Sequence, residues 1–266
     1  MPQVTSKDGT SIVYDRAGDG PAVILVGGGA VDRSENAPLV PELARHFTVY
    51  NYDRRGRGDS SDTLPYALER EFEDVEALIA EAGGSAHLYG VSSGGALVLE
   101  AAAAGVSAGR LAVYEVPYDL GEDTPRRQRE YVAKLDALLA GNRRGEMFEL
   151  FMRTVGSPEE SIEAAKNSPM WPGCEAIAHT LAYDAACLGD GSPPVERLAK
   201  ITQPVLVATG GASPEWFLKG GGDFFAKAAD AIAAALPHAE RLTLEGQTHV
   251  VDPKALAPVL ERFFTQ

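Results

Sequence analysis

The stretch HLYGVSSGGALVLEAAAA, residues 87–104, joins a run typical of a β-strand to an Ala- and Leu-rich run typical of a helix. Where the two runs meet, the chain reads Gly90-x-Ser92-x-Gly94, followed by Gly95. A sharp turn between a strand and a helix leaves room only for small residues on either side of its apex. This context predicts that Ser92 is held at the apex of a nucleophile elbow, with its hydroxyl presented for reaction.

Backbone amides near this turn could bind a developing negative charge. Ser93 would open the helix, where unpaired N–H groups and the helix dipole favour an oxyanion. A second amide is expected from the loop after the strand-like run 22–26, which reads Gly27-Gly28-Gly29. Because glycine lets the backbone approach a ligand closely, we favour the N–H of Gly29, followed by that of Gly28.

Strand-like and helical runs alternate around the turn, which predicts an α/β fold with a mostly parallel central sheet flanked by helices. Three strand runs are apolar nearly throughout, as expected of strands that helices cover on both faces: residues 23–26, 47–52 and 111–116. The first two strand runs flank Asp8-Gly9, which favours an antiparallel hairpin at the sheet edge. Helices are expected over residues 38–46, 69–81, 94–104 and 224–236, and from Pro253 onward.

The pattern changes in the middle of the chain. Residues 119–191 contain helical runs alone. A run of helices inside an alternating pattern predicts an all-helical cap inserted into one core. We therefore divide the chain into a first core part (1–118), the cap (119–191) and a second core part (192–266).

The cap should select the substrate, and its aromatic and Met side chains suit an apolar compound. Met170 and Trp171 stand in a stretch that we interpret as a rigid apolar loop beside the substrate. Tyr183 of the cap and Trp216 of the second core part are two further expected substrate contacts. The same cap side chains also fit a small core of the cap itself.

The chain has five histidines, and their places in the predicted fold separate them. His249 follows the last strand-like run and precedes the closing helix, which places it at the carboxyl edge of the sheet with the elbow serine. His46, His87 and His238 stand at element ends that favour surface or structural roles, and His179 lies in the cap. Because a serine hydroxyl needs a base to become a nucleophile, we assign that role to His249.

The elbow, the late histidine, the glycine loop and the segment YDRRGRGDS (52–60) together resemble the motifs of the α/β-hydrolase superfamily. The resemblance covers essentially the whole chain except the cap. It implies a Ser-acid-His triad, an oxyanion hole of backbone amides, and a substrate cavity between core and cap. In that superfamily the segment from Asp53 to Ser60 is mainly architectural.

The acid of the triad is where the sequence departs from the superfamily pattern. Members usually carry Asp in the turn after the strand that corresponds to residues 204–209, whereas Ser213 stands there. Our preferred substitute is Glu115, at the carboxyl end of the strand after the elbow helix, because some lipases and haloalkane dehalogenases place their acid at this strand end. The alternatives are Glu215 and a Ser-His dyad without an acid, and Glu115 could instead form a structural ion pair with an arginine.

A serine nucleophile with an oxyanion hole favours acyl transfer. Epoxide hydrolases and haloalkane dehalogenases on this fold use an aspartate nucleophile, so Ser92 argues against both. We expect a serine hydrolase that cleaves a small apolar carboxylic ester, lactone or thioester through an acyl-enzyme, with His249 as base. The missing aspartate leaves an alternative, a non-hydrolytic lyase, cyclase or cofactor-free oxygenase that uses His249 for proton transfer. A ligand-binding protein that has lost its chemistry is the third hypothesis.

Composition limits the partners. The 266 residues include 24 Lys and Arg against 38 Asp and Glu, a net charge of -14, and no basic cluster, so nucleic acid is excluded as a partner. No run approaches the ~20 apolar residues of a membrane helix, and the N-terminus has no signal-peptide pattern, so we expect no membrane partner and a cytoplasmic location. The expected partner is a small-molecule substrate, without cofactor or metal, and a homodimer stays open.

Overall fold

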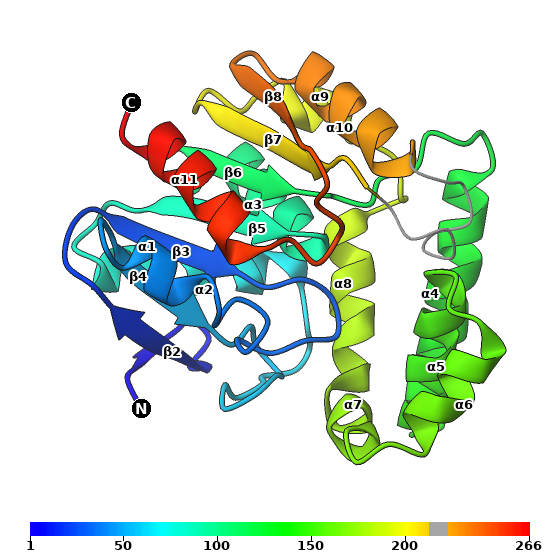
Figure 1. The fold of residues 1–266 in the computed structure, drawn as a ribbon. Helices are drawn as coiled ribbons and strands as arrows, with labels where there is room; N and C mark the ends of the chain where they lie inside the picture. The colour runs from blue at the N-terminus through cyan, green and yellow to red at the C-terminus, as the bar shows by residue number, and fades with distance from the viewer. Residues whose placement is uncertain (213–222) are drawn as a thin grey trace.

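A computed structural model describes residues 1–212 and 223–266 of the chain; Ser213, Glu215 and Trp216, singled out in the sequence, lie outside the described residues. Within these residues, eight strands form one sheet in the order β1-β2-β4-β3-β5-β6-β7-β8 (Figure 1). The strands are β1 (Gln3–Thr5), β2 (Ser11–Ala17), β3 (Ala22–Val26), β4 (Thr48–Tyr52), β5 (His87–Val91), β6 (Leu111–Tyr114), β7 (Val205–Gly210) and β8 (Ala239–Leu244).

Strand direction divides the sheet in two. The edge strands β1 and β2 form an antiparallel hairpin, and β2 is also antiparallel to β4. The six strands from β3 to β8 are parallel to one another. In β3, β4 and β6 every residue is buried, as their continuous apolar sequence predicts for strands covered on both faces. The predicted mostly parallel sheet with an antiparallel edge is confirmed.

The helices follow the sequence pattern closely, with exceptions at residues 38–46 and at Met170 and Trp171. They are α1 (Val40–Leu43), α2 (Leu68–Glu81), α3 (Ser93–Ala103), α4 (Thr124–Ala140), α5 (Arg144–Thr154), α6 (Glu159–Lys166), α7 (Trp171–Ile177), α8 (Leu181–Leu188), α9 (Val195–Leu198), α10 (Phe224–Ala235) and α11 (Pro253–Phe264), with a 3-10 turn at Ala178–Thr180. The helix expected over 38–46 is much shorter. The N–H groups of His46 and Phe47 both donate to the carbonyl of Leu43, and the helix ends there. None of the described helices combines the length and apolar character needed to cross a membrane.

Two apolar clusters, one on each face, hold the helices on the sheet. Helices α2, α3 and α10 pack on one face, where Leu78 and Leu97 join the strand residue Ile24. Helices α1 and α11 pack on the other face, where Leu260 joins the strand residue Leu25. Because successive side chains of a strand point to opposite faces, the neighbours Ile24 and Leu25 belong to different clusters.

Between β6 and β7 the fully described chain forms only helices, α4 to α9. Helices α4, α5 and α8 share a small apolar core around Leu135, Met147 and Leu181. Figure 1 shows α4 to α7 standing away from the sheet, while α8 runs back toward α3. The attachment of these helices to the core therefore depends largely on α8.

The prediction of a loop at Met170 and Trp171 is wrong. Trp171 is the first residue of α7, and Met170 is its N-cap. The N–H groups of Gly173 and Cys174 both donate to the carbonyl of Met170, which starts a helix there. Pro172 is compatible with this start because the first helical N–H groups have no intrahelical acceptor.

The first turn of α3 approaches neighbouring backbone so closely that only glycine fits. A Cβ atom at Gly94 would stand 2.6 Å from the carbonyl oxygen of Val26 and closer still to that of Gly27. A Cβ atom at Gly90 would stand 2.5 Å from the carbonyl oxygen of Gly94. Packing of α3 on β3 and β5 thus requires the glycines that flank the elbow serine.

We predict that Gly94→Ala lowers the free energy of unfolding by about 2 kcal/mol or more, because the added methyl meets rigid backbone. Gly173→Ala is the matched control, since nothing lies within 4 Å of the position that its Cβ would take. Removing a helical glycine there should raise stability by up to about 1 kcal/mol. Urea unfolding followed by circular dichroism measures both, and equal stability of the two variants would contradict the packing argument.

Candidate active site

Ser92 lies at the junction of β5 and α3 in a strained backbone conformation. Its φ is 55° and its ψ is -126°, values that L side chains rarely adopt. The N–H of Ser92 donates to the carbonyl of Tyr114 at the end of β6, over 2.9 Å, which ties the turn to the neighbouring strand. Val91 and Ser93 are buried, whereas Ser92 between them is partly exposed. The fold therefore presents this one side chain of the turn to solvent.

Glu115, directly after β6, contacts the histidine loop with its carboxylate. Its Oε2 lies 2.7 Å from Nδ1 of His249, and its Oε1 accepts a hydrogen bond of 2.8 Å from the N–H of Gly210 at the end of β7. The side chain is 1% exposed. Among the described residues no arginine or lysine lies within ion-pair distance of Glu115, so its partners are the imidazole and one backbone amide.

His249 lies after β8, at the edge of the sheet where β5 and β6 also end. Its ring stacks on Phe225 of α10, with centroids 4.9 Å apart and planes 10° apart. The hydroxyl of Tyr114 donates to the carbonyl of Thr248 over 2.6 Å, which fixes the backbone just before the imidazole. Because Nδ1 faces Glu115, the carboxylate favours the tautomer in which Nδ1 carries the proton and Nε2 can act as a base.

Strained backbone concentrates around these residues. Of the described residues other than glycine, four have a positive φ: Ala30 (55°), Ser92 (55°), Glu115 (49°) and Asn142 (52°). The first three follow β3, β5 and β6, three neighbouring strands whose carboxyl ends meet at one edge. Such strain persists only where surrounding structure enforces it, and it is typical of functional sites.

The glycine loop after β3 brings Gly28 and Gly29 beside the elbow. A Cβ at Gly28 would stand 3.2 Å from Cβ of Ser92, and a Cβ at Gly29 would stand 3.5 Å from Oγ of Ser93. The N–H of Gly28 already has an acceptor, because it donates to Oε2 of Glu35 over 2.6 Å. The expectation that Gly28 supplies an oxyanion amide therefore does not hold while Glu35 occupies that N–H, and Gly29 remains the candidate from this loop.

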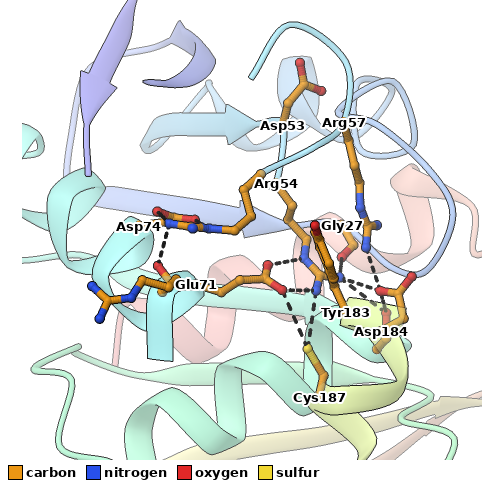
Figure 2. A network of polar contacts seen from close by, with 12 residues as sticks. Gly27, Asp53, Arg54, Arg57, Glu71, Asp74, Tyr183, Asp184 and Cys187 are labelled. Atoms are coloured by element: carbon orange, nitrogen blue, oxygen red, sulfur yellow. Dashed lines mark hydrogen bonds and ion pairs between the residues drawn. The ribbon is translucent and has the colours of Figure 1, made fainter. Parts of the chain in front are cut away.

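A buried network of charges lies beneath the elbow and the glycine loop (Figure 2). Arg54 makes a two-pronged contact with Glu71, with distances of 2.7 Å and 2.8 Å, and its Nη1 donates to Asp184 over 2.9 Å. Arg57 donates to the same Asp184 oxygen over 2.7 Å. Asp184 belongs to α8, so the network joins the cap helices to the segment after β4. Two positive and two negative side chains balance within it.

Asp184 also holds the residues that surround Ser92. The hydroxyl of Ser93 donates to Asp184 over 2.8 Å, and the N–H of Ala30 donates to it over 3.2 Å. Arg57 donates in turn to the carbonyl of Gly28 over 2.6 Å. Burial by itself raises the pKa of Asp184, but Arg57 and Arg54 outweigh it and hold that pKa below its ordinary value. Asp184 is therefore a charged anchor shared by α3, the glycine loop and the cap.

Three of the predicted substrate contacts, all in the cap, have protein partners or lie at the surface. Met170 is 75% exposed, and Trp171 packs edge-on against Phe148 within the cap, with ring centroids 5.6 Å apart. The hydroxyl of Tyr183 donates to Asp62 over 2.8 Å, and its ring stacks on Tyr66. These three residues thus have structural or surface settings, and Trp216 lies outside the described residues.

Sequence reasoning missed Glu35, Asp184 and the direct contacts of Arg54 and Arg57 with the glycine loop. Only the YDRRGRGDS segment signalled that arginines matter in this region, and its resemblance implied an architectural role. No pattern marked Asp184, which stands in an Ala-rich helix far along the chain. Among the described residues no group of three or more His, Cys, Asp or Glu side chains could hold a metal ion.

Comparisons with known proteins agree with this architecture. The profile of a family described as "Alpha/beta hydrolase family" matches residues 23–259. The chain is 33% identical over 248 residues to a pimeloyl-[acyl-carrier protein] methyl ester esterase of Xanthomonas campestris pv. campestris, covering 88% of this chain and 90% of that protein. An alpha/beta hydrolase structure from Sphaerobacter thermophilus has a TM-score of 0.86 and 49% identity, covering 99% of this chain and all of that one. A hydrolase structure from Pseudomonas aeruginosa has a TM-score of 0.74 and 25% identity, covering 100% and 98%.

We predict that Asp184→Asn lowers the free energy of unfolding by about 3 kcal/mol or more, because it leaves Arg57 buried without a carboxylate partner. Asp123→Asn is the matched control, since Asp123 pairs with Arg126 on the exposed surface of α4. The control should leave the urea midpoint nearly unchanged. A midpoint for Asp184→Asn as high as that of the control would show that the network does not hold the cap to the core.

Proposed function

Because the chain belongs to the alpha/beta hydrolase family, we propose that it is a serine hydrolase that cleaves a small carboxylic ester, lactone or thioester through an acyl-enzyme on Ser92. One observation carries the proposal: Glu115 Oε2 lies 2.7 Å from His249 Nδ1, at the sheet edge where the strained elbow presents Ser92. This arrangement supports a triad of Ser92, His249 and Glu115, with its acid after β6 instead of after β7.

In the first half of the proposed reaction, His249 takes the proton of the Ser92 hydroxyl while Oγ attacks the ester carbonyl carbon. The carbonyl oxygen gains the negative charge, and the N–H groups of Ser93 and Gly29 are the proposed donors to it. Collapse of this intermediate breaks the bond to the leaving alcohol, which takes the proton from His249. An acyl-Ser92 ester remains.

In the second half, His249 takes a proton from water, and the resulting hydroxide attacks the acyl-Ser92 carbonyl carbon. The second intermediate collapses to release the carboxylic acid, and the proton returns to Oγ of Ser92. The enzyme is regenerated with one water consumed.

Glu115 acts in both halves through the imidazole. Its carboxylate stabilises the imidazolium that forms when His249 holds two protons, and it orients the ring. The hydrogen bond from Gly210 to the other carboxylate oxygen holds Glu115 in place without neutralising its charge. Glu115 therefore keeps its position beside the imidazole while the proton moves between Ser92, His249 and the leaving group.

The substrate is proposed at the level of the bond that breaks. The Xanthomonas relative is named for a methyl ester, so simple methyl and ethyl esters of short acids are the first substrates to try. The non-hydrolytic alternative rests on the missing aspartate after β7. Because Glu115 offers a carboxylate to His249, the missing aspartate does not favour a non-hydrolytic enzyme over a hydrolase, and we propose hydrolysis.

We predict that wild-type protein hydrolyses p-nitrophenyl butyrate, that Ser92→Ala and His249→Ala abolish the activity, and that Glu115→Gln lowers kcat by about 10⁴-fold through loss of the carboxylate charge. Glu215→Gln is the matched control, because it makes the same change in the alternative acid and should retain activity. Intact mass after fluorophosphonate treatment should show one adduct, absent from Ser92→Ala. A large loss of activity in Glu215→Gln but not in Glu115→Gln would assign the role of the acid to Glu215. A Ser92 that is neither labelled nor needed for activity would refute the proposal.

A further inference from the structure

Glu35 is a carboxylate beside the elbow that the proposed reaction does not use. Its Oε2 accepts the N–H of Gly28 over 2.6 Å. Its Oε1 lies 3.3 Å from the point where a Cβ at Gly28 would stand, and Cβ of Ser92 lies 3.2 Å from the same point. The carboxylate of Glu35 and the side chain of Ser92 are therefore close neighbours beside Gly28.

Glu35 is open to solvent, unlike the other carboxylates of the site. The residue is exposed, whereas Glu115 and Asp184 are buried. Many protein atoms nevertheless surround the carboxyl, and this burial raises the pKa of Glu35, against the lowering effects of the Gly28 N–H, His249 and Arg57. Glu35 is therefore a solvent-exposed residue whose carboxyl lies against the glycine loop.

Among the described residues, no lysine or arginine lies within ion-pair distance of Glu35. Arg57 and His249 act on the carboxyl of Glu35 electrostatically, and each has another partner: Arg57 bonds to Asp184 and the Gly28 carbonyl, and His249 faces Glu115. Asp184 adds to the negative potential at Glu35.

The lack of a lysine or arginine partner among the described residues has a chemical consequence for the reaction. A free carboxylate next to the oxyanion of an acyl intermediate raises the energy of that intermediate, since like charges repel. A cation on the substrate, placed against Glu35, would remove this repulsion and gain a charge-assisted hydrogen bond. A carboxylate on the substrate would increase the repulsion instead.

We propose that Glu35 is a substrate-binding residue that recognises an ammonium group on the acyl part of the ester, a few carbon atoms from the carbonyl. The inference rests on the proposed function and narrows its substrate class to amino-substituted esters. The Gly28 N–H holds the carboxylate in position, so the recognition site is preformed. Neutral esters lack this contact, and acidic esters are disfavoured.

The test uses three ethyl esters of nearly equal size at about pH 7, where aliphatic amines are protonated. Ethyl 3-aminopropanoate is cationic, ethyl butyrate is its neutral isostere, and monoethyl succinate is anionic. We expect Glu35→Gln to lower the ratio of kcat/KM for the cationic ester over the neutral ester by about tenfold or more. The same substitution should raise the relative rate of the anionic ester. Comparing ratios between variants cancels the intrinsic reactivity of each ester and any partial loss of folded enzyme.

Glu76→Gln on the exposed side of α2 is the matched control for the change in net charge, and it should keep the wild-type ratio. Wild-type preference for the cationic ester should also weaken as salt is added, because the site is open to solvent. An unchanged ratio in Glu35→Gln would overturn the inference while leaving ester hydrolysis intact.

A binding measurement separates this inference from the proposed function. 4-Aminobutan-2-one is a ketone with the same ammonium group and cannot be hydrolysed, and pentan-2-one is its neutral isostere. Calorimetry should show tighter binding of the amino ketone to wild type and no such difference in Glu35→Gln. Equal binding of both ketones to wild type would refute the role of Glu35 whatever the enzyme hydrolyses, whereas a hydrolysis that persists in Ser92→Ala would refute the proposed function alone.

Discussion

The carboxylate of Glu115 joins the ends of three strands, and the site takes its shape from that contact. One oxygen accepts the N–H that ends β7, and the other faces the imidazole that follows β8. A buried carboxylate is costly unless its hydrogen bonds are satisfied, so these partners are needed to hold it in this buried position. The backbone at Glu115 adopts a positive φ to reach them. Strain at one residue thus sets the position of His249 relative to the elbow.

The same geometry explains why the acid can stand on a different strand from the usual one. Strands β6 and β7 are adjacent and parallel, with Tyr114 opposite Ala208, so both end at the same edge of the sheet. A carboxylate after either strand can therefore approach the loop that follows β8. An acid after β6 has the same relation to the imidazole as one after β7, so the proposed triad needs no acidic residue at position 213.

The cap is joined to the core by charge as well as by apolar packing. Asp184 on α8 receives hydrogen bonds from Arg54, Arg57, Ser93 and Ala30, which belong to three separate segments of the core. Buried ion pairs add little to stability compared with well-packed apolar groups, but they tolerate few alternative arrangements. The network therefore specifies how α8 sits on α3 and, through Arg57, where the glycine loop lies.

Local sequence signals predicted the parts of the site that depend on backbone geometry. The elbow, the order of strands and helices, and the place of His249 follow from glycine spacing and from the alternation of apolar runs. Such signals do not identify a substrate contact within the cap, because an apolar residue such as Trp171 fits a cap core as well as a cavity. In the structure Trp171 packs on Phe148. Asp184 gave no signal either, since its partners Arg54 and Arg57 lie about 130 residues away and are brought near only by the fold.

Two carboxylates, Asp184 and Glu35, contact the glycine loop. Their surroundings differ, and the difference favours a structural role for Asp184 and the proposed role in substrate recognition for Glu35. Asp184 lies beneath the loop with two arginines, so its charge is cancelled inside the protein. Glu35 holds the loop through a single N–H, has no lysine or arginine partner among the described residues, and is an exposed residue. If Glu35 served only to fix the loop, a neutral amide could accept the same hydrogen bond at lower electrostatic cost. The carboxylate of Glu35 beside the proposed position of the oxyanion is the feature from which we infer a cation on the substrate.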